Sequence, residues 1–138
     1  MSTEIMPMSS NETNSNIIFS TITAQGIDAA ITIANAVNNP DSLNDVKDVI
    51  AVVDILCTHG VRKGRNNLPD TPCVNTTLIC KDGTALFSQS DGVARSASTI
   101  VTLFPDCGRS QGMEYLPLRV NEKVLKNGNT LKVLEIVR

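Results

Sequence analysis

Short apolar runs, separated by turn-forming residues, recur along most of this 138-residue chain and predict a protein rich in β-strands. The strongest run covers residues 46–58 and is apolar on both faces of a strand. Such a pattern is typical of a long barrel strand that is covered on two sides. Shorter strands are predicted over residues 17–23, 73–80, 85–89, 115–125 and 130–137.

Two tight turns link neighbouring runs into hairpins. Asp82-Gly83 lies between the runs 73–80 and 85–89, and Asn127-Gly128 lies between the last two runs. Both pairs tolerate the positive φ angles that a short hairpin loop requires. The sequence therefore predicts two β-hairpins at these positions.

Two segments instead show helical periodicity. Ile27, Ile31, Ala34 and Val37 recur at helical spacing before Pro40, which cannot continue a helix. A clearer stripe follows the helix-capping pair Ser90-Asp91 and is formed by Val93, Ala97, Ile100, Val101 and Phe104. We expect one helix before the main strand and a second between the third and fourth strands.

From residue 46 onward the predicted order is three strands, a helix and two strands. This is the element order of the OB-type five-stranded barrel, in which a helix between strands 3 and 4 caps the barrel. A polar loop over residues 59–72 joins the first two strands, and the Asn-Gly loop joins the last two. OB folds use these two loops to bind single-stranded nucleic acid. We therefore predict a mainly β fold with α: an OB-type barrel plus an N-terminal helix.

The ends of the chain differ in character. Residues 1–16 are rich in Ser, Thr and Asn and lack periodicity, so we expect a disordered arm that is dispensable for folding. Residues 17–138 are expected to form a single OB-like nucleic-acid-binding domain. The arm has no Lys or Arg and thus no secretory signal, and no apolar run approaches the length of a membrane span. We expect a cytoplasmic protein without membrane contact.

The distribution of charge permits a polyanionic partner. Residues 1–45 hold five acidic and no basic residues, whereas residues 46–138 hold 12 basic and nine acidic residues, a net charge of +3. Arg62, Lys63 and Arg65 form a basic cluster in the predicted binding loop. Further candidate DNA contacts are Lys81, Arg119, Lys123, Lys126 and Lys132, with Phe87 and Tyr115 as candidate stacking rings. The alternatives are a solvated loop for the basic cluster and core packing for Phe87.

No residue pattern predicts a catalytic or metal site. Cys57 and His59 could share one face of a strand, but the other three cysteines lack the spacing of zinc ligands. We expect reduced, mostly buried thiols, no cofactor, no metal and no enzymatic activity. Asp54, inside the apolar run, is expected to face solvent or a basic partner.

From about Gly26 to the C-terminus the chain resembles a known family. The likeness rests on the Ala-rich helix over 28–37, the strand over 48–56, the Lys81-Asp82-Gly83 turn, the helix start at residues 92–97 and a final Lys/Val-rich strand. In these features the chain resembles the small single-stranded-DNA-binding proteins of tailed phages that replicate linear DNA by protein priming. The resemblance implies a non-catalytic, sequence-independent binder of displaced strands, with replication proteins such as the DNA polymerase as further partners. Family members stack bases on tyrosines, and here Tyr115 is the only one.

Two functional hypotheses remain open on the sequence. The first is single-stranded DNA binding in phage DNA replication. The alternative is a non-enzymatic protein-interaction or virion accessory module on the same barrel, because a fold by itself does not decide function.

Overall fold

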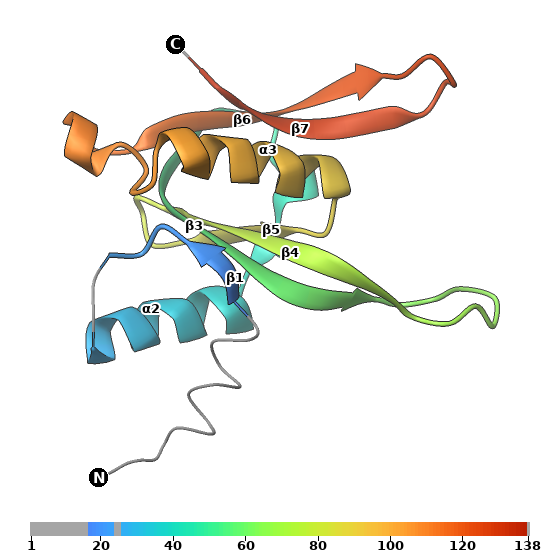
Figure 1. Ribbon diagram of the computed structural model, residues 1–138, viewed down its shortest axis with the longest axis horizontal. Helices are drawn as coiled ribbons and strands as arrows, with labels where there is room; N and C mark the ends of the chain where they lie inside the picture. Colours follow the sequence, from blue (N-terminus) through green and yellow to red (C-terminus); the bar gives the residue numbers. More distant parts are fainter. Residues whose placement is uncertain (1–16, 24–25, 138) are drawn as a thin grey trace, which may run out of the picture.

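The protein is described from a computed structural model that covers residues 17–23 and 26–137 (Figure 1). The predicted arm, residues 1–16, lies outside the described residues. The described chain is mainly β with two helices, and its sheet curls into a half-barrel. This confirms the predicted mixture of strands and helices.

A single curled sheet holds all the strands of the described residues. Its order is β2-β5-β4-β3-β6-β7, with β1 paired to β3 beside the main path, so that β2 and β7 form the two edges. The strands are β1 (Ile17–Ser20), β2 (Asp41–Ser42), β3 (Ile50–Arg62), β4 (Thr71–Cys80), β5 (Ala85–Ser88), β6 (Leu116–Val124) and β7 (Thr130–Ile136). The helices are α2 (Ile27–Asn38) and α3 (Asp91–Leu103), with 3-10 turns η2 (Leu43–Asp45) and η3 (Arg109–Gln111).

The boundaries of the longest strand differ from the prediction. The expected start at residue 46 is wrong because residues 46–49 only connect η2 to the sheet, and strand pairing begins at Ile50, opposite Leu118 of β6. The expected end at residue 58 is also wrong, since backbone pairing with β4 continues to Arg62 opposite Thr71. Polar side chains do not interrupt this ladder, because hairpin pairing uses the backbone. The loop shortens to residues 63–70, and Arg62 belongs to β3.

The main core lies between the curled sheet and α3. Alternating residues of the strands meet the apolar stripe of α3, and the members include Val52, Ile55, Leu78, Val93, Ala97, Leu116 and Leu118. In Figure 1, α3 lies between the β3–β4–β5 layer and the β6–β7 hairpin. The Leu134 amide of edge strand β7 donates a hydrogen bond to Ser96 Oγ of α3 (2.8 Å). The helix thus satisfies part of an edge that would otherwise be open to further pairing.

Helix α2 covers the other side of the sheet, but it turns an unexpected face inward. Ala36 is its one buried residue and packs in a small cluster with Ile79 and Ala85. The stripe that marked this helix in the sequence is exposed, with Ile27 at 76% and Ile31 at 52% of full exposure. Because nearly all sides of α2 are apolar or small, its pattern does not identify the packed face.

In the part of the chain that the structure describes, no helix combines the length and apolar character needed to cross a membrane.

Candidate nucleic-acid interface

Two basic hairpins project toward the same end of the molecule (Figure 1). One consists of β3, the loop 63–70 and β4, and the other of β6, the turn 125–129 and β7. We call them the first and the second hairpin. Their exposed cations that form no ion pair with a described carboxylate are Lys63, Arg65, Arg119, Lys123 and Lys126.

The first hairpin has a fixed loop and a braced base. The Gly64 amide donates a hydrogen bond to Asp70 Oδ1 (2.8 Å), which ties the two sides of the loop together. At the base, Arg62 Nη2 donates to the Gln89 carbonyl (2.6 Å) and lies 3.8 Å from Asp91 Oδ1. These contacts hold Arg62 in place while leaving Lys63 and Arg65 in solvent.

Gln89 links this hairpin to the start of α3. Its Nε2 donates to Asn75 Oδ1 (3.0 Å) on β4 and to the Val61 carbonyl (3.3 Å) on β3. A side chain at position 60 would collide with Asn75, so Gly60 leaves room for this bracing. Gln89 was missed in the sequence because a lone glutamine at a strand end forms no motif.

A shallow cleft separates the two hairpins and brings cations from both together. It is lined by Arg62 and Gln89 on one side and by Thr130, Leu131 and Lys132 on the other. Lys132 Nζ donates to Asn44 Oδ1 (2.8 Å) of η2. Asp91, the first residue of α3, also lines the cleft and reduces its positive charge near Arg62.

A row of basic residues follows β6. Leu118 and Val120 pack toward the core, so the alternation of a strand places Arg119 and Lys123 on the opposite, exposed face. Four residues of strand separate neighbouring cations by about 13 Å. Tyr115 directly precedes this strand, and Lys126 lies in the turn beyond it. We call this set (Tyr115, Arg119, Lys123 and Lys126) the β6 row.

Lys81 reaches the start of the β6 row from the β4–β5 turn. Its Nζ lies 5.5 Å from the centroid of the Tyr115 ring and donates a hydrogen bond to Glu114 Oε1 (2.8 Å). That hydrogen bond raises the pKa of Lys81 and lowers the pKa of Glu114. Tyr115 is 36% exposed, so part of this residue remains accessible to a ligand.

The predicted site residues do not all gather in one place. Lys81 and Tyr115 lie at the far end of β4 from the loop 63–70, and ten residues of strand extend over about 33 Å. Phe87 lies on the face of β5 that α2 covers, because Ala85, two residues earlier, packs against Ala36. Arg62 and Lys132 line the cleft, Arg119 and Lys123 of the β6 row follow the exposed face of β6, and Phe87 stands apart from both.

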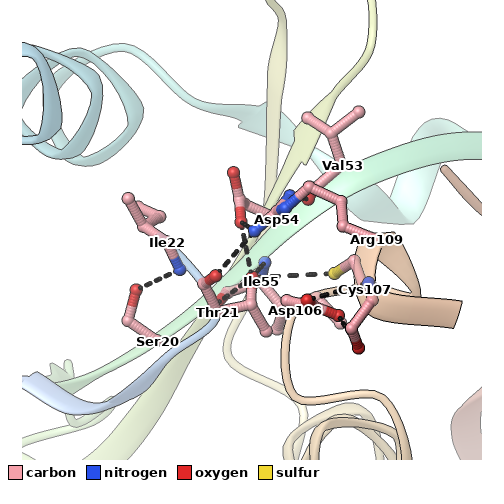
Figure 2. A network of polar contacts seen from close by, with 10 residues as sticks. Ser20, Thr21, Ile22, Val53, Asp54, Ile55, Asp106, Cys107 and Arg109 are labelled. Atoms are coloured by element: carbon pink, nitrogen blue, oxygen red, sulfur yellow. Dashed lines mark hydrogen bonds and ion pairs between the residues drawn. The ribbon is translucent and has the colours of Figure 1, made fainter. Parts of the chain in front are cut away.

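An arginine clasp shapes the strand that carries the first hairpin (Figure 2). A β-bulge between Val52 and Asp54 bends β3 where its pairing changes from β6 to β1. Arg109 of η3 donates to the Val53 carbonyl (2.6 Å), the Thr21 carbonyl (2.8 Å) and Asp54 Oδ1 (3.0 Å). The guanidinium thus satisfies carbonyls at the bend and pairs with the carboxylate beside them.

Thr21 completes this clasp from the inside. Its buried hydroxyl donates to Asp54 Oδ1 (2.8 Å) and accepts from the Ile55 amide (2.8 Å). The prediction that Asp54 meets solvent or a basic partner is confirmed by the ion pair with Arg109. The bend directs the outer half of β3, and with it Arg62, away from β6.

The cysteines take no part in a cluster of ligands. Cys57, Cys80 and Cys107 are buried and Cys73 is half-buried, while His59 is exposed. Burial raises the pKa of Cys57 and of Cys107 to about 11, which keeps both thiols protonated at neutral pH. No group of three or more His, Cys, Asp or Glu side chains within the described residues could hold a metal ion.

The curled sheet and its two basic hairpins define a small β-rich protein with an exposed surface for a polyanion. The model of the Phi29 phage single-stranded DNA-binding protein family matches residues 12–137, nearly the whole chain, so the protein belongs to that family. Searches of curated proteins and of solved structures found no match. The family is defined by DNA binding rather than by an enzymatic reaction, and single-stranded DNA is therefore the ligand to fit to this surface.

Proposed function

We propose that the protein coats displaced single strands during phage DNA replication, without preference for sequence. The β6 row carries this proposal, because it presents three cations and one aromatic ring along the exposed face of β6 and at its two ends. Phosphates of an extended strand are the complementary partner for such a row. The curled sheet is proposed to be an OB-type barrel, formed by β3 to β7 and opened between β5 and β7.

In this proposal the strand follows the β6 row and enters the cleft between the hairpins. Phosphate contacts come from Arg119, Lys123 and Lys126 and then from Lys132, with Lys63 and Arg65 approaching from the first hairpin. Contacts to phosphates carry no information about bases, which explains why binding would be independent of sequence.

Arg62 is proposed to exchange its partner when DNA binds. In the free protein its guanidinium faces Asp91 at 3.8 Å, which is longer than a close charge-assisted hydrogen bond. A phosphate in the cleft offers a second oxygen partner at shorter range. The Gln89 carbonyl can retain the Arg62 side chain during this exchange.

Tyr115 is proposed to stack one base at the start of the row, with Lys81 next to it for a phosphate. Base stacking on an aromatic ring does not distinguish sequences, because each base has a π face. Phe87 remains a candidate for a second, separate contact. Replication proteins such as the DNA polymerase are proposed as further partners.

Titration of labelled oligo-dT at several salt concentrations tests the proposal. Replacing Arg62, Lys63 and Arg65 with Ala should weaken binding of all sequences alike. The log–log salt slope should fall by about 2, since each lost phosphate contact on a single strand contributes roughly 0.7. Absence of binding by the wild-type protein at low salt would refute the proposal and favour a protein-interaction module.

A charge-matched variant controls for the loss of net charge. Lys47 and Arg95 are exposed cations that lie outside the proposed path. The variant K47A/R95A should keep nearly the wild-type affinity. In K123A/K126A the log–log salt slope should fall by about 1.4, because two phosphate contacts are lost. Equal losses in the two double variants would show that net charge, and not the β6 row, governs binding.

A further inference from the structure

Helix α2 presents an apolar surface that nothing in the described structure covers. Ile27, Ile31 and Val37 are 76%, 52% and 48% exposed, and the small residues Ala30 and Ala34 between them are exposed as well. We call these five residues the α2 stripe. Asp28 is the only charged residue of the helix, so the stripe itself carries no charge. A surface helix ordinarily turns a polar face to water, and a contiguous apolar face of this kind marks an interaction site.

A groove runs along one flank of this stripe. It lies between α2 and the sheet and is lined by Ala29, Ile33 and Val37 of the helix and by Ile17, Thr58 and His59 of β1 and β3. Ala30 and Ala34 of the stripe also line this groove, whereas Ile27 and Ile31 do not and form a ridge beside it. One copy of the chain therefore carries both a ridge and a neighbouring groove of matching apolar character.

We propose that the α2 stripe is a self-association surface, on which a second copy of this chain docks through a two-fold axis. In an isologous contact the same patch must be complementary to itself, and a ridge beside a groove meets that condition. The ridge of each copy would enter the groove of the other. Ala30 and Ala34 allow close approach of the two helices, and the uncharged stripe creates no like-charge repulsion across the axis.

The size of the surface sets the strength of this contact. A helix of 12 residues is about 18 Å long. One helix against its own copy buries less than the ~800 Å² per partner that is usual for a stable complex. The association is therefore weak and reversible, and monomers and dimers exchange as the concentration changes.

The position of α2 keeps this contact apart from the proposed DNA path. Figure 1 shows α2 on one side of the β3–β4–β5 layer and both α3 and the β6–β7 hairpin on the other side. Two copies joined through α2 would leave both β6 rows exposed. Self-association is thus independent of the proposed function and is measured without DNA.

Sedimentation velocity of the full chain over a wide range of concentrations tests the proposal. The wild type should show a concentration-dependent increase in sedimentation coefficient. The double variant I27E/I31E should raise the dimer dissociation constant at least about tenfold, because each glutamate would lose water in the contact. The variant S98E/T99E is the matched control, since it adds two charges at exposed positions of α3, away from α2, and it should associate like the wild type.

Further variants identify the occupant of the groove. Cross-linking of the Ile31→Cys variant with a short bismaleimide should give covalent dimers well above the wild-type background. Deletion of residues 1–16 should leave the association unchanged. A wild-type chain that stays monomeric at all concentrations would overturn the proposal, and so would association that is lost with the deletion but unaffected by I27E/I31E. The thermal transition of I27E/I31E should equal that of the wild type, which shows that the variant is folded.

Discussion

Removal of the arginine clasp should destabilise the fold far more than removal of any solvated arginine. The variant Arg109→Met keeps an unbranched side chain but loses the three hydrogen bonds to Val53, Thr21 and Asp54. It leaves the Val53 carbonyl at the β3 bulge and the Thr21 carbonyl without this donor. It also leaves a carboxylate whose side chain is only 15% exposed without its cation.

The expected cost follows from these losses. Hydrogen bonds to charged groups contribute about 1.5–3 kcal/mol each when buried, but the Arg109 side chain is 35% exposed and water can replace part of each bond. We therefore expect a loss of about 2–4 kcal/mol in the free energy of unfolding. For a domain of this size, that corresponds to a decrease in Tm on the order of 10 °C.

Urea unfolding followed by far-ultraviolet circular dichroism suits this measurement, because the chain has no Trp and only one Tyr. Arg95→Met provides the control, since Arg95 is exposed on α3 and has no ion pair among the described residues. It should change stability by less than about 0.5 kcal/mol.

A double-mutant cycle with Asp54→Asn separates the ion pair from the rest of the clasp. In the wild-type background this substitution weakens the contact with Arg109 and should destabilise the protein. In the Arg109→Met background it removes an unpaired carboxylate and should be neutral or stabilising. If Asp54→Asn is equally harmful in both backgrounds, or if Arg109→Met behaves like Arg95→Met, the clasp does not stabilise the bend as described.

Two further predictions concern the row and the thiols. Tyr115→Ala should weaken oligo-dT binding by about 1–3 kcal/mol with little change in the salt slope, because stacking releases no counterions. A large change in slope, measured in the same titrations, would assign Tyr115 to phosphate binding instead. The contribution of the two thiols to stability should be constant below pH 9 and fall between about pH 9 and 11, since the unfolded chain releases the Cys57 and Cys107 protons near the usual pKa of 9.0 while the folded chain holds them until about 11. Cys57→Ala should reduce this loss in the free energy of unfolding by on the order of 2 kcal/mol, as measured by urea unfolding at several pH values. An unchanged pH profile would contradict a buried thiol at position 57.

The sequence alone determined the features that depend on neighbouring residues. The turns at Gly83 and Gly128 have φ angles of 90° and 87°, as Asp-Gly and Asn-Gly pairs require. Helix α3 begins where Ser90 Oγ accepts a hydrogen bond from the Val93 amide, as its capping pair predicted. These elements were predictable because a turn or a cap is fixed by a few adjacent residues.

The tertiary structure alone decided which distant groups meet. Arg109 and Asp54 are separated by 55 positions, and Thr21 joins them from the segment directly after β1. Lys132 and Arg62 line one cleft, while Phe87, a candidate stacking ring, lies on the face of β5 that α2 covers. The direction of each side chain depends on the bulge in β3 and on the curl of the sheet, and neither has a signature in the local sequence. Helix α2 shows the same limit, since an element that is apolar nearly all round acquires its inner and outer faces only when it packs against the sheet.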